Sequence, residues 1–322
     1  MSQSHFSNFI GYLHHHPALE GLERPHVFVG FTKDYAALAN GIVGAGSSEP
    51  GRTRFTSCAL DQESTERAAE GIRACDLFLL LYDSSTLPAP SPRGPDFIVA
   101  LKAIITEHWK KSVVFKDYGR HFEDAFRIAP ERIRTLNRRL IDIAKRSSRL
   151  EFTDAYGSRL TAELLGAEQK WTDVNGYGSP DLTPGEIATH TDRINGRVFF
   201  TGTFLSTIPF AIKYGIVEEP VELVISNGAI ESIATDNASL KRDLEQYIAM
   251  NESNRRVEEL GIGTNEGVTK LYARNAGFEE RHCGLHLGLG GSKRGSHHLD
   301  LIFATGALAF DGQKIFDGHY TL

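Results

Sequence analysis

The run Leu77–Tyr82, LFLLLY, constrains the fold more than any other segment of this sequence. It is continuously apolar, is bounded by Asp76 and Asp83, and is far too short to cross a membrane. A strand of this composition is usually covered on both faces, as in parallel sheets whose connections are helices. Amphipathic helical patterns stand on either side of it, at residues 64–75 and 97–111. The first half of the chain is therefore predicted to form an α/β layer.

The second half has a different pattern. From residue 150 onward, short alternating apolar segments rich in Gly, Thr and Asn follow one another, which is typical of antiparallel sheet. Asn227 and Gly228 stand between two such segments, and this pair is a strong hairpin signal. We predict an α/β protein with an N-terminal parallel-sheet α/β domain, residues 1–148, and a mainly antiparallel α+β domain, residues 149–322.

Composition excludes several classes of partner. A chain of 322 residues is long enough for two domains, and its formal charge of -6 gives no electrostatic reason to expect nucleic acid. Three cysteines are too few for a disulfide framework, which favours a reducing compartment. The first residues lack the basic start and apolar run of a signal peptide, and no segment approaches the roughly 20 apolar residues of a membrane span. We expect a cytoplasmic protein with neither a nucleic-acid nor a membrane partner.

The segment from residue 257 to residue 301 contains most of the candidate functional residues. Eight of its acidic and imidazole side chains are candidate functional groups: Glu259, Glu279, Glu280, His282, His286, His297, His298 and Asp300. His298 and Asp300 are two residues apart in an H-x-D triplet, so on a strand their side chains share a face. His286 lies on the preceding strand, and the turn SKRG can bring the two strands into a pair. The segment therefore predicts a metal site.

The donor types narrow the choice of metal. Two imidazoles with carboxylates suit zinc, iron, cobalt or manganese better than calcium or magnesium, which prefer oxygen cages. His286, His298 and Asp300 alone would equally match the 2-His-1-carboxylate triad of an Fe(II) site. The alternative is a Gly/His-rich hairpin whose imidazoles make ordinary hydrogen bonds. Spacing by itself leaves these alternatives open.

A family resemblance adds to this interpretation. The run ELGIGTNEG, an acidic stretch before a strand with a histidine and L-G, and the H-x-D triplet together resemble the aminopeptidase T family of metalloaminopeptidases, particularly its shorter bacterial branch. Three upstream segments resemble that family in the same order: LEFTDAYGSRLTAEL, LTPGEIATHTDRINGRVFF and PVELVISNGAIESI. The similarity extends from about Arg138 to the C-terminus. The same scaffold also resembles ring-opening dihydroxypyridine dioxygenases, which use one ferrous ion.

The resemblance implies roles for individual residues. Five fall at the family's metal-ligand positions: Glu186, Glu259, His286, His298 and Asp300. Glu280 matches a glutamate that would stand behind the ligands or handle protons, whereas Glu279, His282 and His297 are expected to be neighbours only. The family's tyrosine after the ligand histidine is absent, its place falling near Lys293, and the intervening loop is shorter. Lys293 or the neighbouring Arg294 is the candidate for electrophilic help in its place.

Three functions follow as hypotheses. The first is an aminopeptidase-like hydrolase of peptide or amide bonds that uses one or two ions of zinc, cobalt or manganese to activate water. The second is a mononuclear Fe(II) ring-cleaving dioxygenase. The third is a non-catalytic peptide-binding protein on the same scaffold that assists peptide modification, which the short loop and the missing tyrosine favour. The resemblance also implies a homodimer.

Overall fold

The structure, a computed structural model, describes residues 4–48, 53–61, 63–82, 96–178, 182–206, 208 and 210–322. By packing, the chain forms two compact units, one of residues 1–130 with 176–184 and the other of residues 131–175 with 185–322. Compactness alone does not show which segments fold independently, so the domain boundary after residue 148 stays a prediction. Among the described residues, no helix is both long enough and apolar enough to cross a membrane.

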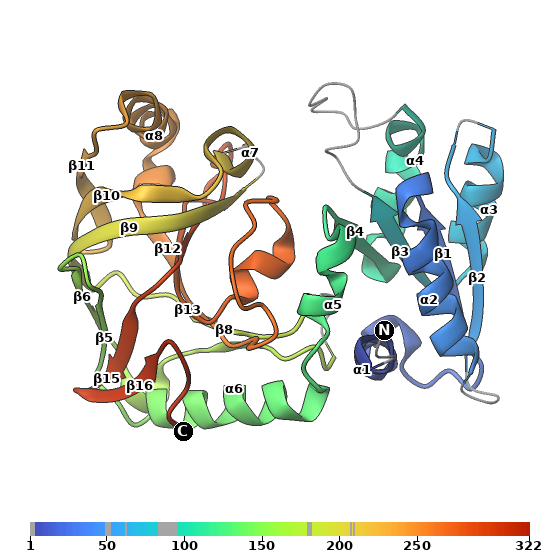
Figure 1. Cartoon of the computed structure of the whole chain (residues 1–322), viewed down its shortest axis with the longest axis horizontal. Helices are drawn as coiled ribbons and strands as arrows, with labels where there is room; N and C mark the ends of the chain where they lie inside the picture. The colour runs from blue at the N-terminus through green and yellow to red at the C-terminus, as the bar shows by residue number, and fades with distance from the viewer. Residues whose placement is uncertain are drawn as a thin grey trace. The chain divides into compact units, whose positions relative to one another are not determined.

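The first unit is built around a parallel sheet, as the apolar run predicted. Within the described residues its strands are β1 (His26–Phe31), β2 (Arg54–Ala59), β3 (Leu77–Tyr82) and β4 (Ser112–Lys116), in the spatial order β2-β1-β3-β4. Its helices are α1 (Ser4–Leu13), α2 (Ala36–Ser47), α3 (Thr65–Ala74), α4 (Asp96–Glu107) and α5 (Phe122–Ala125) (Figure 1).

Helices cover both faces of this sheet. Phe28 of β1 and Phe78 of β3 stack with their ring centroids 5.7 Å apart. They belong to a core cluster to which α3 contributes Ile72 and α4 contributes Leu101. Helix α2 packs against the opposite face, where Phe55 of β2 lies. Because the central strands are covered on both sides, a continuously apolar sequence is the one that fits them.

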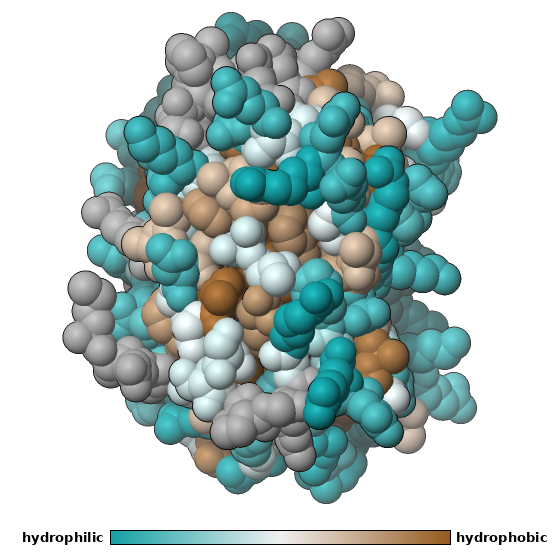
Figure 2. All heavy atoms as spheres, turned by 90° about the vertical axis from the view of Figure 1, so that its right-hand side faces the viewer, coloured by the Kyte–Doolittle hydropathy of each residue, from teal (hydrophilic) through white to brown (hydrophobic). Residues whose placement is uncertain are grey.

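The outer side of this unit carries a mixed surface. Figure 2 shows the side of the molecule on which β2 and α3 lie, where hydrophilic side chains surround a paler, more apolar area. Strand β2 is at the edge of its sheet, and of its residues Phe55 and Cys58 are the buried ones. Apolar atoms contribute more than half of most protein surfaces, so this area alone assigns no partner.

The second unit is a large antiparallel sheet with three helices. Its strands within the described residues are β5 (Arg149–Thr153), β6 (Arg159–Glu163), β7 (Thr172–Val174), β8 (Glu186–Thr189), β9 (Ile194–Ser206), β10 (Val217–Ser226), β11 (Ala229–Ala234), β12 (Val257–Gly263), β13 (Gly284–Leu289), β14 (Leu299–Phe303), β15 (Ala307–Phe310) and β16 (Gln313–Asp317). The helices are α6 (Pro130–Ala144), α7 (Phe210–Tyr214) and α8 (Ala238–Met250). The sheet order is β16-β15-β5-β6-β9-β14-β13-β12-β8-β7, with β10 and β11 added on β9.

Strand β13 shows how this sheet separates core from site. Its three leucines, Leu285, Leu287 and Leu289, belong to the apolar core of the unit. The alternate residues are Gly284, His286 and Gly288, which share the opposite face because successive side chains of a strand point in opposite directions. A parallel α/β layer followed by a mainly antiparallel α+β unit is the fold class that the sequence predicted.

Candidate metal centre

Register places the acidic groups in one row of the sheet. Glu259 of β12 pairs with Gly288 of β13, and Gly288 pairs in turn with Asp300 of β14. Paired residues of antiparallel strands share a face, so the two carboxylates flank a glycine that offers no side chain between them. His298 stands just before β14, two residues from Asp300, on the same face. The predicted pairing of the two strands is confirmed.

The next pairings along β12 bring in the other imidazole, His286, and a further carboxylate, Glu186. Gly261 of β12 pairs with His286 of β13, and Gly263 pairs with Glu186 of β8. A Cβ atom at Gly261 would collide with Nε2 of His286, so the imidazole fits only because this position is glycine. The glycines of β12 and β13 thus leave the space that the side chains of the site occupy.

The donor atoms converge in two groups that share one residue. In the described part of the chain, Glu186, Glu259 and His286 form one group, and Glu259, His298 and Asp300 form the other. Within each group one possible ligand atom from each residue lies within 4.8 Å of the others. All five residues that the resemblance identified as ligands are thus brought together, although His286 and His298 fall in different groups.

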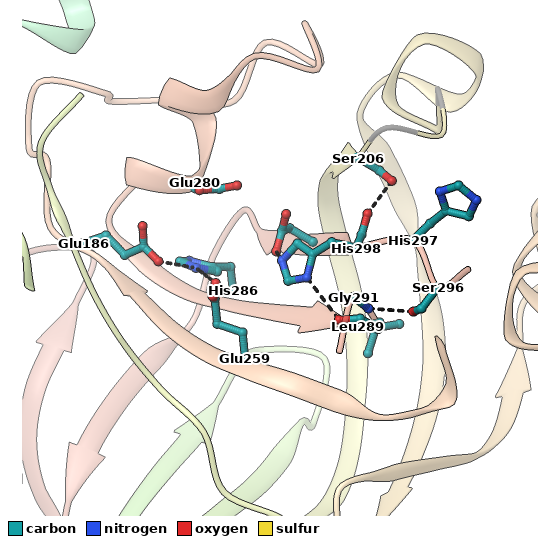
Figure 3. Close-up of polar contacts among 12 residues, drawn as sticks. Glu186, Ser206, Glu259, Glu280, His286, Leu289, Gly291, Ser296, His297 and His298 are labelled. Carbon is teal, nitrogen blue, oxygen red and sulfur yellow. Dashed lines mark hydrogen bonds and ion pairs between the residues drawn. The ribbon is translucent and has the colours of Figure 1, made fainter. Parts of the chain in front are cut away.

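In the first group Glu186 and His286 are buried, and a buried cation, Arg281, lies beside Glu186. Nε2 of His286 lies 3.2 Å from Oε1 of Glu186 and 3.3 Å from Oε1 of Glu259 (Figure 3). The other oxygen of Glu186 accepts a hydrogen bond from Nη1 of Arg281, which also lies 2.8 Å from Oε2 of Glu280. Only 4% of the Arg281 side chain is exposed. This guanidinium was not predicted from the sequence, because its contact with Glu186 joins segments far apart in the chain.

In the second group, possible ligand atoms of His298 and Asp300 lie close together. Nε2 of His298 lies 2.7 Å from Oδ1 of Asp300, yet this buried oxygen has no hydrogen bond of acceptable geometry. The other ring nitrogen, Nδ1, donates to the carbonyl of Gly290 at 3.2 Å. Such a bond fixes the orientation of an imidazole and directs Nε2 as a ligand atom.

Charges within the site shift two pKa values. The close contact with Asp300 outweighs desolvation and raises the pKa of His298 to about 9. Burial alone would raise the pKa of Glu259, but the neighbouring His286 and His298 imidazoles hold it below its ordinary value. The His298 shift reports the negative charge of the carboxylates beside it, and the Glu259 shift reports the positive charge of the neighbouring imidazoles.

The two groups differ in access to solvent. The His298 side chain is 41% exposed and that of Glu259 is 33% exposed. His286 and Glu186 are almost wholly buried. A ligand from solvent therefore meets the second group first.

The two predicted catalytic groups lie in different surroundings. Glu280 is close to Glu186 and His286 in Figure 3 and shares Arg281 with Glu186. Lys293 lies in the loop between β13 and β14, and its ammonium group pairs with Glu252 at the surface. The structure thus places Glu280, but not the Lys293 ammonium in its present pairing, beside the ligand set.

The neighbouring residues have structural contacts. The buried carboxylate of Glu279 accepts the backbone N–H groups of Tyr272, Ala273 and Arg274 at 2.7, 2.9 and 2.6 Å. Burial lowers the pKa of His282 to about 4. Glu279 therefore holds the chain between β12 and β13, and His282 is neutral in the folded protein at neutral pH.

The residues present suit a divalent metal. Each group offers one imidazole nitrogen and two carboxylates, a mixture that zinc, cobalt, manganese and iron accept. The buried Oδ1 atom of Asp300 supports this, because it makes no hydrogen bond and its close contact, at 2.7 Å, is with Nε2 of His298, itself a possible ligand atom. Candidate metal-ligand groups are therefore present, and their donor types do not identify the metal.

Comparison with solved structures decides the fold. AmpT, aminopeptidase T, from Thermus thermophilus matches with a TM-score of 0.60 and 14% identity, covering 99% of this chain and 99% of that chain. The chain has the fold of aminopeptidase T. The 2,5-dihydroxypyridine dioxygenase from Pseudomonas putida KT2440 matches similarly, with a TM-score of 0.59 and 13% identity over 99% of this chain and 96% of that one. The predicted resemblance is thus confirmed as a shared fold that hosts two chemistries.

Sequence comparisons give a further similarity. A family model described as "Crocagin biosynthetic protein CgnE/B" matches residues 216–311, less than half of the chain. That stretch contains Glu259, His286, His298 and Asp300 but not Glu186. No curated protein matches the sequence. Support for an activity therefore comes from the site residues themselves.

Proposed function

We propose that this protein is a metal-dependent hydrolase of peptide or amide bonds that acts in the manner of an aminopeptidase. One observation carries the proposal: two groups of ligand atoms share Glu259, and one of these groups is open to solvent. The aminopeptidase T fold supports it. The separation of His286 from His298 favours this hypothesis over the Fe(II) triad, which would need both imidazoles and Asp300 around one ion.

The proposed metal is zinc, cobalt or manganese, held by residues from the set Glu186, Glu259, His286, His298 and Asp300. Bound there, a divalent ion would polarise a carbonyl and supply hydroxide near neutral pH. The proposed substrate class is a peptide with a free amino terminus, whose positive charge the partly exposed carboxylate of Glu259 suits.

Two further residues have proposed parts in catalysis. Glu280, beside Glu186 and Arg281, would accept and return a proton. Lys293 would stabilise negative charge on the substrate oxygen, which requires that its ammonium group leave Glu252. Both roles are compatible with the five proposed metal ligands, since neither residue is one of them.

A non-catalytic peptide-binding protein is the second candidate. The pairing of Lys293 with Glu252 and of Arg281 with Glu186 favours it, since both cations are engaged by carboxylates of the protein itself. The match to a biosynthetic protein family across residues 216–311 also favours it. On this hypothesis the site residues would hold a peptide for another enzyme to modify. A homodimer stays a prediction for either candidate.

The experiment is metal analysis of the purified chain and of two variants. We expect His298→Ala and Asp300→Ala to abolish binding of zinc, cobalt or manganese while the circular dichroism spectrum stays that of the wild type. Release of an amino-terminal residue from a free peptide by the wild type alone would support the hydrolase. Wild-type metal content in both variants would contradict the ligand assignment.

A further inference from the structure

Arg281 distinguishes the two halves of the candidate metal centre. Its guanidinium is buried, stays protonated at any ordinary pH, and bonds one oxygen of Glu186 while lying 2.8 Å from an oxygen of Glu280. A permanent buried charge must stay paired, because an uncompensated one is strongly destabilising. A divalent ion that took Glu186 as a ligand would compete with this pairing and stand beside a fixed positive charge.

The oxygens of Glu186 already have protein partners. One accepts from Arg281 and the other lies 3.2 Å from Nε2 of His286. The second nitrogen of His286, Nδ1, is buried and has no protein hydrogen-bond partner. Metal-bound histidines almost always donate this second N–H to a carbonyl or carboxylate. The first group therefore lacks a feature that holds a histidine as a metal ligand.

The second group has the opposite properties. His298 donates its second N–H to the carbonyl of Gly290, as metal-bound histidines do. In the described part of the chain, no lysine or arginine pairs with Glu259 or Asp300. The buried Oδ1 atom of Asp300 also has no hydrogen bond. Within the described residues, Glu259 and Asp300 therefore contact imidazoles, which are metal-ligand groups, and no permanently charged side chain.

We propose that the chain binds a single divalent ion, at Glu259, His298 and Asp300, and that Arg281 is the fixed cation of the other group, where it takes the place of a second metal ion. This inference rests on the proposed metal dependence and narrows its five ligands to three. Glu186 then orients Arg281 and His286, and His286 contacts the Glu259 carboxylate from the buried side.

The arrangement has a consequence for substrate. Arg281 is almost wholly buried and its charge is paired with Glu186 and Glu280, so a metal ion at the second group would offer substrate a positive charge that Arg281 does not. His298 and Glu259 flank that position and are partly open to solvent. A substrate group with a lone pair, such as a peptide carbonyl or amine, would meet a single ion instead of a bridged pair.

The test is the number of ions bound per chain. The full chain is freed of metal with a chelator, titrated with Zn²⁺ in a calorimeter, and analysed for zinc after gel filtration. We expect one ion for the wild type and for Glu186→Gln, none for Asp300→Asn, and two for Arg281→Met. Arg281→Lys is the matched control and is expected to stay at one, because it keeps a cation beside Glu186.

The outcomes separate this inference from the proposed function. Two ions in the wild type, with one lost in Glu186→Gln, would overturn the single-ion proposal while leaving metal dependence intact. One ion in a folded Arg281→Met variant would likewise overturn the role of Arg281. If Arg281→Met fails to fold, Glu186→Gln still decides whether Glu186 is a ligand. No Zn²⁺ bound to the wild type would overturn the proposed function, and the inference with it.

Discussion

At the scale of single residues, Gly261 leaves the space that the His286 ring fills. The residue has an ordinary strand conformation, so the requirement is close approach and not an unusual backbone angle. Gly288 of β13 plays the same part for His298 and Glu259, because a Cβ there would lie 2.6 Å from the His298 ring and 2.9 Å from Glu259 Cβ. Small residues at alternate positions thus set where the ligands stand.

Replacement of Gly261 tests this directly. We expect Gly261→Ala to displace His286 and to lower metal affinity by about tenfold or more, as changes behind metal ligands do. Gly44→Ala in α2 is the matched control, since a Cβ at Gly44 meets nothing within 4 Å. Calorimetric titration with Zn²⁺ compares the two variants. Equal affinity in both would contradict the role assigned to Gly261.

His282 predicts a pH dependence of stability. Burial lowers its pKa from 6.5 to about 4, so the unfolded chain takes up a proton that the folded chain refuses. The stability is complete above pH 6.5 and is lost as the pH falls from 6.5 toward 4. Between pH 7 and pH 5 this loss amounts to about 2 kcal/mol.

Urea unfolding at the two pH values measures this loss. We expect the wild type to lose more free energy of unfolding than His282→Gln does, by roughly the same 2 kcal/mol. The difference between the two proteins isolates His282 from other groups that titrate in this range. An identical pH dependence in both would show that His282 takes up its proton at the same pH in the folded and the unfolded chain.

At the scale of secondary-structure elements, the strand patterns were predictable and the connections were not. The alternation GLHLGLG predicts a strand with leucines on one face and His286 on the other, and its pairing with the H-x-D strand follows from the short turn between them. The loop from β12 to β13 gives no such signal. Its conformation depends on Glu279, whose carboxylate binds three backbone amides, and on positive φ angles of 54° at Ala273 and 55° at Asn275.

The loop between β13 and β14 carries the prediction for Lys293. If this lysine stabilises the substrate oxygen, Lys293→Ala lowers kcat by about a hundredfold. The neighbouring Arg294→Ala is the matched control and leaves kcat unchanged. Glu252→Gln, which releases the ammonium group from its ion pair, keeps or raises kcat. Steady-state kinetics with a free peptide measures all three, and equal rates for the two loop variants would assign Lys293 to the surface alone.

At the scale of the whole molecule, the two kinds of sheet were predictable because each has its own sequence periodicity. Continuous apolar runs such as Leu77–Tyr82 predict a covered parallel sheet, and alternating runs predict an antiparallel one. Two features could not be predicted, because they join distant parts of the sequence. Residues 176–184 pack with the first unit, where Gly178 bonds the His15 carbonyl, and Arg281 reaches Glu186.

The most direct test of the central claim is turnover by the metal-loaded full chain. The protein with bound zinc, cobalt or manganese is incubated with a short free peptide and with its N-acetylated form, and products are identified by mass spectrometry. We predict release of the amino-terminal residue from the free peptide alone, and no release by Asp300→Asn. Metal-loaded protein that binds the free peptide and leaves it intact would contradict the hydrolase and favour the peptide-binding protein.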